Sequence, residues 1–339
     1  MKSSSTIRLH IGNAVPHGNE SDTKHVIALW QEISGFFSQQ QRFSALSGIR
    51  GETRPYLIAI DASQILKTLE HAQDQSQAFN GYRMAHIDHA DKAVDASLVI
   101  TIGSKDHPLE EEESYQVATV FLQQLIMAAH IIRPGSIQVL DAHFIGPGAH
   151  RFEAQNFDSR IFHGALRAAI DNEWPKLQRH SLETVWRWLE GCQVSETDIA
   201  IKGINQVLFT LLKVAEQRHE YSARTVLLVM YQLEVLLDCR QFNSLEPVGH
   251  RVRMVLGKIP EAADCLAELH EVRNSLFTGH QPVRRPPLIC HNTEKALRDQ
   301  FDQHHSAVES GTALVLTLLQ DLISHQAYSY EFTETFSRR

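Results

Sequence analysis

The chain has 339 residues, with 32 lysines and arginines against 40 aspartates and glutamates, which gives a net charge of −8 at pH 7. A domain with a single hydrophobic core is usually shorter than this, so the length predicts two domains. The acidic balance speaks against a nonspecific nucleic-acid coat, because such proteins bind phosphates through a general excess of basic residues. Any action on RNA must therefore rest on a local basic site.

The sequence also bears on where the protein works. The N-terminus, MKSSSTIRLHIGN, lacks the apolar run of a secretion signal, and the longest apolar runs are too short and interrupted to cross a membrane. The cysteines lie far apart and form no CxxC pair, so zinc sites of the common kinds are not expected (Cys192, Cys239, Cys265, Cys290). We therefore expect a cytoplasmic protein with reduced thiols, no membrane partner, no metal and no other cofactor.

The first part of the chain, residues 1–157, predicts a mixed α/β domain. Short runs rich in β-branched residues and bounded by turn residues predict strands at 7–12, 56–62, 97–103 and 136–146. Helical patterns lie between them at 20–40 and 109–132. The second helix begins with four acidic residues, which the helix dipole favours at that end. It is followed by Arg133-Pro134-Gly135, a strong helix breaker.

From about residue 158 the strand pattern disappears and helical periodicity continues almost to the end. We interpret residues 158–195 as a helical connector and 196–330 as an all-helical domain. The fold class expected for the whole chain is therefore α+β. The predicted helical segments are 160–172, 175–191, 196–219, 222–239, 246–257, 261–280 and 291–326.

The most informative stretch is ELHEVRNSLFTGHQPVRRP, residues 268–286. On a helix, Arg273 and His280 are seven residues apart, so their side chains would leave nearly the same face. Gly279 and Pro282 place His280 at the frayed C-terminal end of that helix. Arginine makes planar, bidentate contacts with phosphate, and histidine exchanges protons near neutral pH. Asn274 could orient either group through its amide. The spacing alone leaves open the alternative that Arg273 pairs with Glu271 or a neighbouring helix, while His280 only terminates its own.

These residues resemble the motif of HEPN ribonucleases, in which an arginine and a polar residue precede a histidine. RNSLFTGH has six residues between arginine and histidine, the long end of the family's range, and carries Gly-His where many members have His-Gly. The flanking segments resemble the family's four core helices, and the similarity is greatest to bacterial Apea-like HEPN proteins. It covers about residues 200–330 (core helices 230–239, 248–259, 265–280 and 296–325).

The resemblance implies a metal-independent RNA endonuclease that works as a homodimer. Two motif helices would meet so that both Arg/His pairs form one cleft, and cleavage would leave a cyclic phosphate on the upstream fragment. Arg273 would hold the scissile phosphate, His280 would act as acid and base, and Asn274 would support them. Glu234 lies in the segment similar to the first core helix, and we expect it to support the site structurally.

Basic residues around the motif are the expected contacts to the rest of the RNA. Between His250 and Arg298 basic residues outnumber acidic ones, opposite to the sign of the whole chain. We predict phosphate contacts by Arg284 and Arg285, which directly follow the motif, and by Arg251 and Arg253. For Arg284 and Arg285, a solvated loop pair remains an equal alternative.

The N-terminal domain gives weaker signals. HIDHAD at 86–91 has two histidines three apart, but nothing completes a metal site by spacing. Asp61 and Asp141 follow strand patterns, where carboxylates either serve function or cap loops. We interpret this domain as regulatory, open to an inhibitory or activating protein or ligand, and the whole chain as a defence or toxin effector. Two alternatives remain: an inactive HEPN module that binds partners in a defence complex, and an enzyme located in the N-terminal domain.

Overall fold

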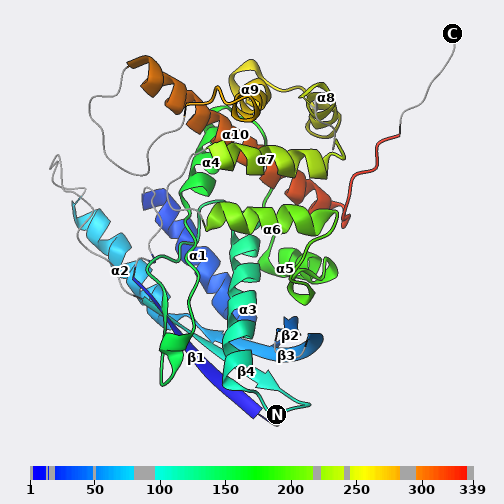
Figure 1. Cartoon of the computed structure of the whole chain (residues 1–339). Helices are drawn as coiled ribbons and strands as arrows, with labels where there is room; N and C mark the ends of the chain where they lie inside the picture. Colours follow the sequence, from blue (N-terminus) through cyan, green and yellow to red (C-terminus); the bar gives the residue numbers. More distant parts are fainter. Residues whose placement is uncertain are drawn as a thin grey trace. The chain divides into compact units, whose positions relative to one another are not determined.

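The computed structural model describes residues 3–12, 14, 20–48, 51–79, 96–216, 223–239, 245–282 and 295–333. The chain forms two compact units, each built from discontinuous pieces. The first, the sheet unit, comprises Met1–Arg167, Arg179–Ile199 and Leu211–Glu220. The second, the helical unit, comprises Ala168–Gln178, Ala200–Thr210 and Tyr221–Arg339. Figure 1 labels the α-helices and the strands β1 to β4.

A five-stranded sheet in the order β2-β3-β4-β1-β5 organises the sheet unit, and every neighbouring pair is antiparallel. The strands bury alternate residues, as the period of two in an extended chain requires. In β1, for example, Ile7, Leu9 and Ile11 are buried and the residues between them are not. The strands are β1 (Ser3–Ile11), β2 (Gln41–Ser47), β3 (Glu52–Asp61), β4 (Ala96–Ser104) and β5 (His143–Ile145).

Helices cover the apolar side of this sheet (Figure 1). Among them, α3 (Glu111–Ile132) contacts β1, β2 and β4, and most of its length is buried. Aromatic rings fill the space around Phe37, whose ring meets those of Phe121 and Trp186 edge to face. The other helices with residues in this unit are α1 (Glu20–Phe37), α2 (Ser63–Phe79), the greater part of α4 (Arg160–Asp171), α5 (Leu182–Gly191) and the end of α6 (Ile204–Ala215).

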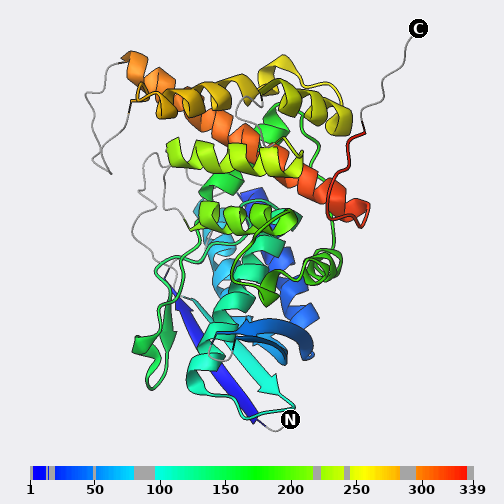
Figure 2. The same ribbon diagram turned by 45° about the vertical axis from the view of Figure 1, so that its right-hand side comes forward.

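The helical unit packs three helices against one another as its core. These are α7 (Ala223–Leu236), α9 (Leu266–Phe277) and α10 (Lys295–Ser324), which contact each other pairwise (Figure 2). The last helix buries an almost continuous apolar stretch from Ala313 to Ile323. A further helix, α8 (Leu245–Leu256), contacts α9. This packing brings α7 and α9 together, and with them two of the predicted site residues.

The predicted α+β class is confirmed: an antiparallel sheet with its helices is followed by a wholly helical C-terminal part. Two strand predictions need correction. The strand β2 was missed, because Phe43 is the only large apolar side chain among its buried residues, and the predicted strand at 136–146 is reduced to His143–Ile145. The predicted domain boundaries near 157 and 195 stay predictions, since both compact units are assembled from separated pieces.

Two described helical stretches are long and apolar enough to cross a membrane by composition, Glu111–Ile132 and Asp302–Ser324. Of their most apolar windows, 72% and 83% respectively is buried inside the protein. Both are therefore consistent with core helices of a soluble protein.

Candidate functional site

Glu234 and Arg273 meet in the helical unit where α7 packs against α9. The Nη1 atom of Arg273 donates to Oε1 of Glu234, and the side chains are only 12% and 13% exposed. Their sequence neighbours are buried apolar residues, Leu233 and Val235 on α7 and Val272 on α9. A charge at such a depth needs a partner, and each of these residues provides one for the other.

His270 lies one helical turn before Arg273 and belongs to the same group. Burial lowers the pKa of its imidazole, the positive charge of Arg273 lowers it further, and Glu234 acts in the opposite direction. Its Nδ1 atom is buried and has no hydrogen-bond partner within the described part of the chain. Sequence reasoning missed this residue, although a histidine three positions before the arginine was a signal that could have found it.

The end of α9 determines where His280 lies. The helix ends at Phe277, and Gly279 adopts a left-handed conformation with φ of 74°. The backbone N–H of Gly279 then donates to the carbonyl of Leu276, while that of His280 donates to the carbonyl of Ser275 at 2.8 Å. This is a Schellman motif, in which glycine is the favoured residue because the left-handed region penalises a Cβ.

The prediction that Arg273 and His280 share one helical face is therefore wrong, because His280 lies three residues beyond the helix end. Its side chain is exposed and makes no hydrogen bond or ion pair with the described part of the chain. Asn274 is also exposed. The structure thus brings Arg273 together with Glu234 and His270, and it shows no contact that joins Arg273 to His280.

The four arginines predicted to contact RNA differ in their surroundings. Arg251 donates from Nη1 to the carbonyls of Leu237 and Asp238, at 2.5 and 2.9 Å, and its guanidinium lies 4.5 Å from the ring centre of Phe332. These contacts secure the C-terminal end of α7. Arg253 is exposed on α8. Arg284 and Arg285 lie outside the described residues, so their contacts with RNA stay predictions.

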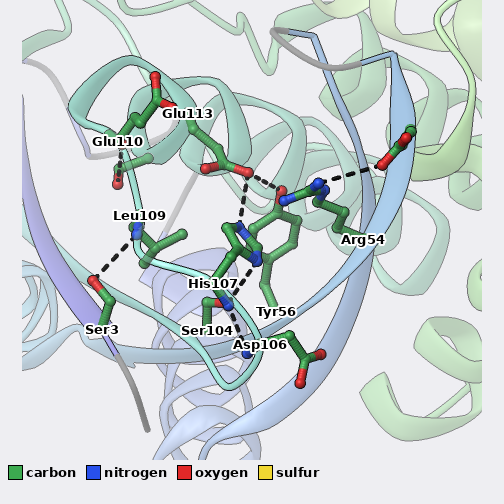
Figure 3. Close-up of polar contacts among 11 residues, drawn as sticks. Ser3, Arg54, Tyr56, Ser104, Asp106, His107, Leu109, Glu110 and Glu113 are labelled. Carbon is green, nitrogen blue, oxygen red and sulfur yellow. Dashed lines mark hydrogen bonds and ion pairs between the residues drawn. The ribbon is translucent and has the colours of Figure 1, made fainter.

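A polar cluster in the sheet unit was not predicted at all. Glu113, at the start of α3, accepts through Oε1 from the hydroxyl of Tyr56 at 2.7 Å and lies 3.1 Å from Nε2 of His107. The Nδ1 atom of His107 lies 2.9 Å from the hydroxyl of Ser104. Figure 3 shows Tyr56 and His107 both pointing at the Glu113 carboxylate. Tyr56 and Glu113 are 57 residues apart, so no local sequence motif predicts the cluster.

The electrostatics of this cluster favour an ionised Glu113. Burial by itself raises the pKa of that carboxyl, but hydrogen bonds with Tyr56 and His107 outweigh it, so the pKa lies below its usual value. Burial, together with Glu113, raises the pKa of the Tyr56 hydroxyl. Tyr56 is therefore a neutral donor to a carboxylate, an arrangement that stabilises both groups.

The order Ser104, His107, Glu113 resembles a nucleophile, a base and an orienting acid, but the environment of Ser104 argues against nucleophilic chemistry. Its side chain is fully buried, and its hydroxyl oxygen accepts from the backbone N–H groups of Asp106 and His107, at 3.4 and 3.3 Å. A hydroxyl used in this way caps a turn. The cluster thus fixes the loop between β4 and α3, and this weakens the hypothesis of an enzyme in the N-terminal domain.

The remaining candidates from the sequence have modest roles. Asp61 accepts from the backbone N–H of Ser63 at 2.9 Å and so initiates α2, which lowers the pKa of its carboxyl. Asp141 is exposed, with a φ of 51°. The HIDHAD segment at 86–91 lies outside the described residues. Within the described ranges, no group of three or more His, Cys, Asp or Glu side chains is arranged to hold one metal ion.

Comparisons with known proteins identify no relative, so any function must be inferred from the geometry of the site. No protein-family model, no curated protein and no solved structure matches this chain.

Proposed function

We propose that the chain is a metal-independent RNA endonuclease of the HEPN type, with Arg273, Asn274 and His280 as its reacting residues. The observation that carries the proposal is the pair formed by Glu234 and Arg273. It joins the segment similar to the first HEPN core helix to the segment that carries the motif. A buried acid there gives the arginine one fixed orientation, as positioned charge stabilisation requires.

The proposed chemistry needs no metal because the nucleophile belongs to the substrate. The 2′-hydroxyl of the RNA attacks the adjacent phosphorus, the bond from phosphorus to the 5′-oxygen breaks, and a 2′,3′-cyclic phosphate forms. One proton leaves the 2′-oxygen and one reaches the departing 5′-oxygen. The exposed imidazole of His280 is the proposed acid and base, a contribution on the order of 10²–10⁴-fold. Arg273 stabilises the charge that develops on the phosphate.

A composite site in a homodimer accounts for the lack of contact between Arg273 and His280 within one chain. If two motif helices face each other, the arginine of one protomer need not touch its own histidine. The homodimer, the RNA substrate and the phosphate contacts by Arg251, Arg253, Arg284 and Arg285 are parts of this proposal. So are its cytoplasmic location, its role as a defence or toxin effector, and its control through a protein or ligand at the N-terminal domain.

A second function, an inactive HEPN module that assembles with partners, is favoured by one observation. Arg273 is already neutralised by Glu234 and only 12% exposed, so it presents less positive charge to a phosphate than a solvent-facing arginine would. A protein of this kind would dimerise and bind partners without cutting RNA.

Mixing two inactive variants separates these functions. Purified protein should cleave RNA in EDTA and leave a cyclic phosphate, whereas Arg273→Ala and His280→Ala should each be inactive as homodimers. If each Arg/His pair is shared between the protomers, a heterodimer of the two variants contains one doubly damaged pair and one intact pair, so mixing should restore part of the activity. Unmodified protein that dimerises but leaves RNA intact at high concentration would favour the assembly module.

A further inference from the structure

Two histidines face each other across the edge of the sheet, away from the cluster around Glu113. His10 on β1 is the direct register partner of His143 on β5. Their ring centres are 4.5 Å apart and the ring planes are tilted by 45°. Directly opposed residues of an antiparallel pair hold their Cβ atoms about 5 Å apart, so this proximity is imposed by the backbone.

Both imidazoles lie on the solvent side of the sheet. In β1 the buried residues Ile7, Leu9 and Ile11 alternate with residues that solvent reaches, and His10 is half-buried among the latter. In β5 only Phe144 is buried, and His143 is exposed. A metal ion in solution can therefore reach both rings without any rearrangement of the core.

The chemistry of the pair points to a soft or borderline divalent cation. Imidazole nitrogens suit Zn²⁺, Cu²⁺ and Ni²⁺, whereas Mg²⁺ and Ca²⁺ prefer oxygen ligands. Without a metal, two neighbouring imidazoles gain little from each other, and when protonated they repel. We propose that His10 and His143 form a two-histidine site for a transition-metal ion of the zinc class.

Asp141 lies near the pair, but within the described ranges it does not complete a three-residue metal group with His10 and His143. It precedes His143 by two residues, and its Cβ lies 3.0 Å from where a Cβ would stand on Gly12, two residues after His10. A side chain at position 12 would fill this space, and glycine leaves it to the aspartate. Arg8 lies two residues before His10 on the same side of β1, and its positive charge disfavours the binding of a metal cation.

The site is independent of the proposed nuclease, and its test measures metal binding alone. The full-length protein, freed of metal with EDTA and dialysed, is titrated with Zn²⁺ by calorimetry and with Co²⁺ by its visible absorption. Loss of an outer-shell partner lowers metal affinity about 10–100-fold, so loss of a direct ligand should do at least as much. His10→Ala and His143→Ala should each lower the affinity about tenfold or more, whereas Asp141→Asn should leave it nearly unchanged.

The chain contains 20 histidines, so a matched control is needed. His150→Ala removes another exposed histidine of the same unit and should leave Zn²⁺ and Co²⁺ binding unchanged. All three histidines are at least partly exposed, and circular dichroism will establish that the variants fold. Binding of equal affinity in the unmodified protein, His10→Ala and His143→Ala would overturn the proposal, as would no binding at all.

Discussion

Glu234 of α7 and Arg273 of α9 form an ion pair across 39 residues of sequence, with both side chains almost buried. His270 is close enough for both charges to affect its pKa. The arginine of the proposed nuclease motif thus forms an ion pair with a neighbouring helix, and the proposed site depends on this ion pair. The first prediction tests it directly.

Glu234→Gln should destabilise the protein by on the order of 2–4 kcal/mol, because it leaves the Arg273 charge without its partner in a poorly hydrated position. Arg273→Ala should do about the same, and the double variant should lose less than the sum of the two. Urea unfolding of the three variants gives these free energies. Glu246→Gln on the exposed side of α8 is the control and should change stability by less than about 0.5 kcal/mol. Strictly additive losses would show that the two residues do not interact.

Gly279→Ala should lower stability by about 1 kcal/mol, because a residue with a Cβ is strained at the φ of 74° that closes the Schellman motif. Gly35→Ala is the matched control, and its effect on stability should have the opposite sign. Gly35 lies within α1, exposed and with no atom within 4 Å of an added Cβ, so alanine there should stabilise by about 0.5–1 kcal/mol. Thermal unfolding of both variants provides the comparison. Equal shifts in the same direction would contradict the helix end described above.

The buried imidazole of His130 should make the protein less stable in mild acid. Burial lowers the pKa of its imidazole from 6.5 to about 3, although Asp158 opposes the shift. Between these values the unfolded chain binds a proton that the folded protein does not, so stability falls as the pH drops below 6.5. The slope from this group approaches about 1.4 kcal/mol per pH unit.

Urea unfolding at pH 7, 6 and 5 compares the unmodified protein with His130→Asn, which removes the titrating ring and keeps an acceptor for the Gly135 N–H. The variant should be less stable at pH 7, because it loses the stacking of His130 on Phe162. Its stability should decline less steeply with acid. Parallel pH profiles for the two proteins would rule out a buried neutral histidine.

Tyr56→Phe should destabilise the sheet unit by about 1.5–3 kcal/mol, since it removes a hydrogen bond to a buried carboxylate. Tyr231→Phe, at a tyrosine that is 39% exposed, should have almost no effect. Chemical unfolding of both variants measures the difference. If the two changes were equal, the cluster around Glu113 would not hold the loop between β4 and α3.

The sequence predicted those features that depend on local patterns. Alternation and helical periodicity were enough for β1, β3, β4, α1, α3 and the helices after residue 158, and the acid-rich start of α3 marked that helix correctly, but α2 was missed. What local patterns cannot give is pairing at long range. The partners of Arg273 and of Tyr56 come from other elements, and neither His270 nor Glu113 belongs to a recognisable motif.

The error at His280 has a specific physical origin. The prediction kept His280 on a frayed last turn of the helix, yet Gly279 adopts a left-handed conformation that ends α9 at Phe277 and turns the chain. Gly279 and Pro282 were both visible as helix-ending signals. The balance between a frayed last turn and a closed Schellman motif, however, depends on two backbone hydrogen bonds that only the fold reveals.

The most direct test of the central claim is RNA cleavage in EDTA by three proteins: unmodified, His280→Ala and His250→Ala. Both histidines are exposed in the helical unit, so neither change should alter the fold. The account predicts that the unmodified protein and His250→Ala cut RNA equally, with cyclic phosphate ends, and that His280→Ala loses about 10²–10⁴-fold. Full activity in His280→Ala, or cleavage that stops in EDTA, would contradict it.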